Sequence, residues 1–166
     1  MSMGMMLAQS AVDSGKHAVY MPSYGAEQRG GSAKCVVVID DEEITSPMAQ
    51  YGGVLIAMND MSYEAFIHEL ESDGILIYDS SVVTKDIDRT DIKAVPVPAG
   101  DLALEIGSTK IANVIMNGVL LGLYDIVSPD SFKKSLYVKF ANKSDEVRKL
   151  NTIAFKTGFD LAQKYK

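Results

Sequence analysis

The sequence predicts an α/β fold in a single domain, with helices packed on a mostly parallel sheet. Short apolar runs rich in β-branched residues alternate along the chain with helical patterns, as expected for βαβ units. The length of 166 residues suits one domain and leaves little room for two. No repeat, low-complexity segment or linker divides the chain, so we expect one domain over residues 1–166.

Helices are predicted where apolar residues recur at steps of three and four. Gly15 is a suitable C-terminal cap for the first helix, and Ser62 and Ser144 are the expected N-caps of two others. Gly118 and Gly122 leave room for another backbone to approach one helix closely. The predicted helices cover residues 1–14, 63–73, 101–106, 111–124, 129–140 and 145–165.

Strands are predicted where apolar runs are short and β-branched. The run at 34–40 contains Cys-Val-Val-Val-Ile, which is apolar on both faces and is typical of an interior strand. Cys35 is therefore expected to be a small buried hydrophobic residue. The acidic run 40–43 that follows is interpreted as a solvated turn. The predicted strands cover residues 17–21, 34–40, 54–58, 75–78 and 93–97.

Charge and hydropathy exclude several classes of partner. The net charge is -6 and no run of Lys or Arg opposes it, so nucleic acid is not expected to bind. The most apolar stretch, 111–127, is interrupted by Asn and Asp and is too short to span a bilayer. The first basic residue is Lys16, which does not suit a signal peptide. We expect a cytoplasmic protein that does not associate with membranes.

Independent catalysis has little support in the sequence. His17 and His68 lie in different elements without the spacing of a metal pair, and Cys35 lies in an apolar run. Gly-x-Ser-x-Gly, Walker and Gly-x-Gly-x-x-Gly patterns are absent. A single cysteine cannot build a four-thiolate iron–sulfur cluster. From the residues alone we therefore expect little independent catalysis, and any metal centre would have to come from another chain.

One segment departs from what packing requires: Pro-Ser-Tyr-Gly-Ala-Glu-Gln-Arg-Gly-Gly at 22–31. Its glycines give backbone freedom, and the guanidinium of Arg29 suits a bidentate contact with a phosphate or carboxylate. Alternatively, Arg29 pairs with Glu27 in a structural turn. The residues alone leave both interpretations open.

This segment resembles the signature of the gamma subunit of 2-oxoacid:ferredoxin oxidoreductases, close to the 2-oxoglutarate branch. Other motifs of that family follow in the same order, so the resemblance covers nearly the whole chain. They are Val54–Asn59 (Val-Leu-Ile-Ala-Met-Asn), Leu76–Ser81 (Leu-Ile-Tyr-Asp-Ser-Ser), Val95–Ala99 (Val-Pro-Val-Pro-Ala), Ala112-Asn113, Gly118–Gly122 (Gly-Val-Leu-Leu-Gly) and Asn151–Gly158.

The resemblance implies a Rossmann-like three-layer domain in an enzyme that oxidatively decarboxylates a 2-oxoacid to its acyl-CoA. The expected partners are alpha and beta subunits and a ferredoxin-like delta subunit, with ferredoxin as the electron acceptor. Thiamine diphosphate, Mg and the [4Fe-4S] clusters are expected in those partner subunits, with coenzyme A as co-substrate. The chain is then a non-catalytic subunit that completes the assembly and shapes access to the active site.

Within this family, segment 22–31 either contacts coenzyme A or packs against the alpha or beta subunit. Arg29 and the amides of Gly30 and Gly31 suit the phosphates of coenzyme A, and Tyr24 could line the same wall. The candidate contact residues are Tyr24, Gly25, Glu27, Arg29, Gly30 and Gly31, with Ser23 and Asn59 as secondary candidates.

The chain departs from the family at its start, because family members usually open with a strand and a Gly-x-Gly-Gly-Gln-Gly loop before the first helix. Here the numbered sequence begins inside that helix. Either the numbered chain lacks its native start or this version has lost the first strand, and we favour the missing start, because loss of a central parallel strand would leave unpaired backbone groups. The alternatives within the family are the small subunit of indolepyruvate:ferredoxin oxidoreductase and a pyruvate or branched-chain 2-oxoacid paralogue. A stand-alone nucleotide-binding oxidoreductase is an alternative of a different class. A pure scaffold is a third possibility, which differs from the main interpretation only in whether Tyr24 to Gly31 touches substrate.

Overall fold

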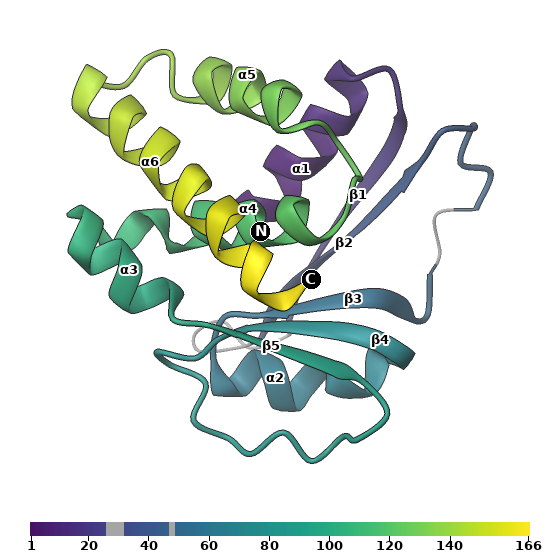
Figure 1. Ribbon diagram of the computed structural model, residues 1–166. Coiled ribbons are helices and arrows are strands. Elements are labelled where there is room, and N and C mark those ends of the chain that lie inside the picture. The colour runs from purple at the N-terminus through teal and green to yellow at the C-terminus, as the bar shows by residue number, and fades with distance from the viewer. Residues whose placement is uncertain (26–31, 47–48) are drawn as a thin grey trace.

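The computed structural model describes residues 1–25, 32–46 and 49–166, which form α-helices, β-strands and short 3-10 turns (Figure 1). The helices are α1 (Ser2–Asp13), α2 (Asp60–Phe66), α3 (Ala99–Ile106), α4 (Ala112–Leu123), α5 (Pro129–Lys139) and α6 (Asp145–Leu161). The strands are β1 (His17–Tyr24), β2 (Ala33–Asp40), β3 (Gly52–Ala57), β4 (Leu70–Asp79) and β5 (Lys93–Val97). The 3-10 turns are η1 (Ile67–Glu69), η2 (Thr109–Ile111) and η3 (Ala162–Tyr165).

The strands β3, β4 and β5 form a parallel sheet in that order, which confirms the predicted α/β class. Ile77 of β4 is in register with Ile56 of β3 and Val95 of β5. Successive side chains of β4 enter different cores: Leu76 packs with Tyr63 of α2, and Ile77 packs with the larger core around α4. Figure 1 shows α2 on one side of this sheet and α4 and α6 on the other.

The strands β1 and β2 pair antiparallel with each other, from His17 with Asp40 to Tyr24 with Ala33. The expectation of an interior strand at 34–40 is therefore wrong for the described structure. In the part of the chain described, β2 pairs with β1 alone, and its central residues are only half-buried. Cys35 is also half-buried rather than buried, although its sulfur faces Gly4 of α1. A continuous apolar run can be covered by one helix and need not lie inside a sheet.

The second helix differs from its prediction at both ends. Asn59, and not Ser62, is the N-cap, because its side-chain oxygen accepts from the Ser62 amide at 2.8 Å. The helix ends at Phe66, since Leu70 already belongs to β4 and pairs with Gly52. Leu70 is buried beside Tyr63 in the smaller core. A buried leucine satisfies a helical and a strand pattern equally well, so periodicity did not decide between them.

The helices α4 and α6 cross at close contact because glycines line their crossing. A Cβ atom on Gly158 would lie 2.0 Å from the Ile115 carbonyl oxygen, and one on Gly118 would lie 2.3 Å from that of Phe155. The predicted close approach of a second backbone at Gly118 and Gly122 is confirmed. The result is a buried α4 between α6 and the parallel sheet. No helix in the described ranges combines the length and apolarity needed to cross a bilayer.

Candidate functional site

The sequence-predicted segment lies at the turn end of the β1–β2 hairpin. Ser23 and Tyr24 are the last residues of β1, and the Gly25 amide donates to the Ser32 carbonyl at 2.8 Å. The Tyr24 side chain is 72% exposed. The structure therefore brings Ser23, Tyr24 and Gly25 together at one end of the hairpin. Four other candidates, Glu27, Arg29, Gly30 and Gly31, lie outside the described residues.

One face of the hairpin is covered by α1 as far as Tyr20. The Tyr20 hydroxyl donates to the Met1 carbonyl at 3.4 Å, and Gly4 lies against Tyr20 and Cys35. Desolvation raises the pKa of Tyr20, and the neighbouring Cys35 and Tyr24 raise it further. Side chains alternate along a strand, so Tyr24 points to this same face but lies beyond the cover of α1. The phenol ring of Tyr24 is thus available to a ligand or to another protein.

The opposite face of the hairpin is anchored to α2 and η1 through Lys34. Its Nζ lies 2.5 Å from both carboxylate oxygens of Glu69 and 5.0 Å from the centre of the Phe66 ring. Lys34 is also in register with Ser23. Sequence reasoning missed this residue, although a lysine near the start of an otherwise apolar strand was an available signal. The pair positions the turn end of the hairpin relative to α2 and η1.

Two buried amide oxygens on α4 have no hydrogen-bond partner among the described residues. They belong to Asn113 and Asn117, which share a face of the helix because they are four residues apart. Asn117 is fully buried, and its Nδ2 donates to the Met3 carbonyl in the first turn of α1 at 3.4 Å. The contacts of Tyr20 and Asn117 thus converge on the same end of α1. Unpartnered acceptors of this kind are uncommon in protein interiors.

Polar side chains at the carboxyl ends of the parallel strands form hydrogen bonds with backbone amides of nearby turns and helix starts. Asn59 and Ser62 form a capping box at the start of α2. The buried carboxylate of Asp79 accepts from the amides of Ser81 at 3.0 Å and Gly100 at 3.2 Å. Sequence reasoning missed this role of Asp79. In the described structure, no hydrogen bond joins Asn59 to the hairpin end, so the secondary candidate lies in a different polar cluster.

Residues suited to metal binding are scattered. In the ranges the structure describes, no three His, Cys, Asp or Glu side chains could hold a metal ion together. Cys35 faces Gly4, and the two histidines lie far apart in sequence, at 17 and 68. A [4Fe-4S] cluster needs four thiolates, and the sequence contains one cysteine. The residues of this chain therefore do not fit such a cluster.

Comparisons with known proteins agree on one family. The family model described as "Pyruvate ferredoxin/flavodoxin oxidoreductase" matches residues 1–161. "Ketoisovalerate oxidoreductase subunit VorA" of Methanothermobacter marburgensis is 36% identical over 166 residues, which cover 99% of this chain and 34% of VorA. The chain thus spans about a third of the length of that curated relative. "2-Oxoglutarate synthase subunit KorC" of Methanocaldococcus jannaschii is 30% identical over 163 residues, which cover 96% of this chain and 86% of KorC.

Solved structures give the same result. The gamma subunit of the keto/oxoacid ferredoxin oxidoreductase of Geobacter sulfurreducens PCA superposes with a TM-score of 0.82 at 27% identity, over 98% of this chain and 90% of that one. A second structure is the 2-oxoglutarate:ferredoxin oxidoreductase of Magnetococcus marinus, solved with 2-oxoglutarate, coenzyme A and succinyl-CoA. It superposes with a TM-score of 0.89 at 26% identity, over 99% of this chain and 29% of that one. The matched family model spans nearly the whole chain, which confirms the predicted resemblance: the chain belongs to the pyruvate ferredoxin/flavodoxin oxidoreductase family.

Proposed function

We propose that the chain is the gamma component of a 2-oxoacid:ferredoxin oxidoreductase. The complex would convert a 2-oxoacid and coenzyme A to acyl-CoA and CO2, and the two electrons released would pass to ferredoxin. The observation that carries this proposal is the similarity to the Geobacter gamma subunit over 90% of that chain's length. A match of this extent favours the gamma component over a small module shared among unrelated proteins.

The role of this chain in the complex would be structural and not catalytic. Its single cysteine favours placing the [4Fe-4S] clusters in partner subunits. We assign thiamine diphosphate and Mg to the partner subunits as well, which are alpha, beta and ferredoxin-like delta subunits. The chain itself would complete the assembly in the cytoplasm and border the route by which substrate enters. The exposed Tyr24 at the hairpin end supports this role, because a large aromatic side chain in water suits a contact surface.

The substrate we propose is 2-oxoglutarate, with succinyl-CoA as the product. KorC of Methanocaldococcus jannaschii supports this choice, because the match covers 86% of that protein. A second candidate is ketoisovalerate, a branched-chain 2-oxoacid, which is favoured by the 36% identity to VorA. The two acids differ in charge and shape at the end remote from the reacting carbonyl, so direct assay separates them.

Native purification of the tagged chain under anaerobic conditions tests the assignment. We expect larger subunits to co-purify with iron, sulfide and thiamine diphosphate. We expect the complex to reduce ferredoxin with a 2-oxoacid and coenzyme A, and assays with 2-oxoglutarate, ketoisovalerate and pyruvate would identify the substrate. A chain recovered without partners or cofactors would contradict the proposal, and nucleotide binding by the isolated chain would favour a stand-alone oxidoreductase.

We also propose that segment 22–31 contacts coenzyme A in the assembled complex. A charge-assisted contact of Arg29 with a phosphate would contribute about 1.5–3 kcal/mol, or roughly a 10- to 100-fold change in affinity. Arg29→Ala should therefore raise the KM for coenzyme A by about tenfold or more while the complex stays intact. Tyr24→Ala should act in the same direction, and Lys156→Ala on α6 serves as the distant control. Loss of assembly with an unchanged KM would instead assign the segment to a subunit interface.

A further inference from the structure

The outward face of α5 combines lysines with large apolar side chains. Phe132 and Leu136 are buried on the inner side, whereas Lys133 and Lys134 are exposed one turn before Tyr137 and Val138. Tyr137 is 64% exposed and Val138 is 71% exposed. These two side chains expose an apolar surface to water, and the ammonium groups of Lys133 and Lys134 lie one turn away on the same helix.

This surface continues from α5 onto α1. The two helices lie side by side (Figure 1), and the Ser135 hydroxyl on α5 donates to the Asp13 carboxylate on α1 at 2.7 Å. Near the other end, Lys139 Nζ lies 4.0 Å from the sulfur of Met5, which is 49% exposed. We call the combined surface the α1–α5 face. Its members are Met5, Lys133, Lys134, Tyr137, Val138 and Lys139.

The charge of the α1–α5 face is opposite to that of the protein as a whole. On α5, the three lysines Lys133, Lys134 and Lys139 outnumber the single carboxylate Asp130, and α1 contributes Asp13, which accepts from Ser135. On α5, Asp130 is paired with Lys133 at 3.2 Å. Lys134 and Lys139 have no ion-pair partner within the described ranges. Positive charge therefore remains available on a chain whose net charge is -6.

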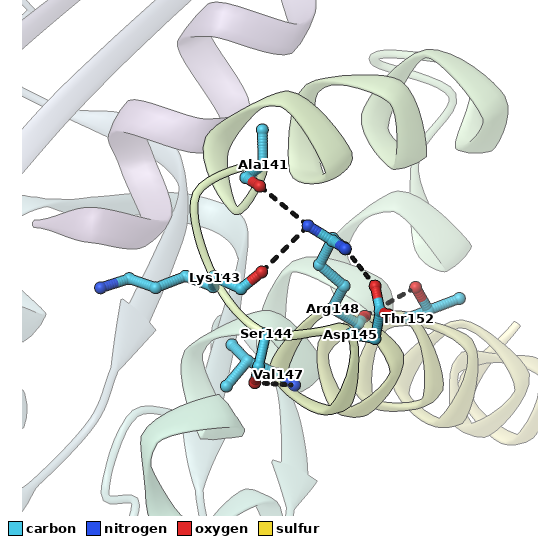
Figure 2. Close-up of polar contacts among 7 residues, drawn as sticks. All are labelled: Ala141, Lys143, Ser144, Asp145, Val147, Arg148 and Thr152. Carbon is cyan, nitrogen blue, oxygen red and sulfur yellow. Dashed lines mark hydrogen bonds and ion pairs between the residues drawn. The ribbon is translucent and has the colours of Figure 1, made fainter.

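Arg148 of α6 binds the connection that follows α5 (Figure 2). The guanidinium donates to the carbonyls of Ala141 at 2.8 Å and Lys143 at 2.9 Å and pairs with Asp145. The same group lies 5.7 Å from the centre of the Tyr137 ring. These contacts fix the connection between α5 and α6 and support the ring from one side. An ordered aromatic side chain loses little entropy when a partner covers it, which favours binding.

We propose that the α1–α5 face docks an acidic surface of a partner protein, with Tyr137 and Val138 at the apolar centre and Lys134 and Lys139 facing carboxylates. The proposal rests on the proposed function, since that function requires partner subunits. Charge complementarity selects the acidic partner, and the apolar centre requires an apolar counterpart, which a protein surface supplies.

Charge reversal in the purified complex tests this proposal. The double variant Lys134→Glu/Lys139→Glu is compared with Lys156→Glu/Lys164→Glu, which makes the same change of net charge on exposed lysines of α6 and η3. The probe is the set of partner subunits separated from the wild-type complex. We expect the first variant to raise the dissociation constant at least about tenfold in low salt. We also expect the dissociation constant of this variant to depend less on salt concentration than that of the wild type. The control should stay within about twofold.

Zero-length carbodiimide cross-linking of the assembled complex gives a second readout. It joins a lysine only to a carboxylate in direct contact, so links from Lys134 or Lys139 to Asp or Glu of a partner subunit are expected. Val138→Ser should weaken binding without changing the unfolding temperature by more than a few degrees. Equal affinities of both double variants, or cross-links only between copies of this chain, would overturn the proposal. A wild-type chain that joins no complex would instead overturn the proposed function.

Discussion

Lys34 on β2 and Glu69 on η1 form the ion pair that connects the antiparallel hairpin to the layer beneath the parallel sheet. The lysine contacts both carboxylate oxygens at 2.5 Å, and each side chain is about 30% exposed, at 30% and 29%. The ring of Phe66 lies 5.0 Å below the same ammonium group. A pair that is partly shielded from water and supported by an aromatic ring is stronger than an open surface pair.

Lys34→Ala should lower the free energy of unfolding by about 1 kcal/mol, since partial exposure screens the pair. Thermal or urea unfolding measures this loss. Lys85→Ala is the matched control, because Lys85 pairs with Glu64 at 2.7 Å while both side chains are more than half exposed. That variant should change stability by about 0.5 kcal/mol or less. Equal effects of the two substitutions would show that the ring and the burial around Lys34 contribute nothing.

Gly158→Ala should destabilise the protein strongly, by roughly 3 kcal/mol or more, because the new methyl group would lie 2.0 Å from the Ile115 carbonyl oxygen. Both groups belong to helix backbones, so relief requires α4 and α6 to move apart. Gly53→Ala is the control, since the nearest heavy atom to its Cβ would be a glutamate oxygen at 4.0 Å. Urea unfolding should separate the two variants clearly, and a Gly158→Ala protein as stable as the control would contradict the close crossing.

Asp91 should stabilise the fold in neutral solution and lose that effect in acid. Hydrogen bonding to Arg89 lowers the pKa of this carboxyl from 3.8 to about 2. Because the folded pKa lies below the unfolded one, the contribution is complete above about pH 4 and disappears as the pH falls toward 2. Urea unfolding between pH 5 and pH 2 should show this loss. Asp91→Asn should flatten that part of the profile, whereas the exposed Asp125→Asn should not.

Asn117→Leu should leave the free energy of unfolding unchanged or raise it by about 1 kcal/mol. The Asn117 oxygen is buried without a partner among the described residues, so the substitution removes a desolvation cost, which offsets the loss of the 3.4 Å hydrogen bond from its Nδ2 to the Met3 carbonyl. Asn151→Leu is the contrast, because the Asn151 amide donates to the Val147 carbonyl at 2.8 Å in a buried position. Its substitution should cost about 1 kcal/mol. A large loss at Asn117 would mean that a donor occupies this position in solution.

Parts of the candidate site could be predicted from sequence and parts could not. Tyr24 was identified from sequence because it lies beside a glycine in a predicted turn, where core packing gives no reason for a large aromatic residue. Lys34 was missed, because its role depends on Glu69, which lies 35 residues later and meets it only in the folded chain. Asp79 was missed for a similar reason, since its carboxylate binds the start of α3.

The sequence by itself determined the helix starts at Ser128-Pro129 and Ser144, the parallel strands β3 to β5, and the family to which the chain belongs. Caps and periodic patterns are encoded within a few neighbouring residues, so local chemistry is sufficient to locate them. Only the tertiary structure decided that β1 and β2 pair antiparallel, that Leu70 lies in a strand, and that α1 and α5 lie side by side. Each of these depends on contacts between segments far apart in sequence, where burial and partner geometry outweigh local preference.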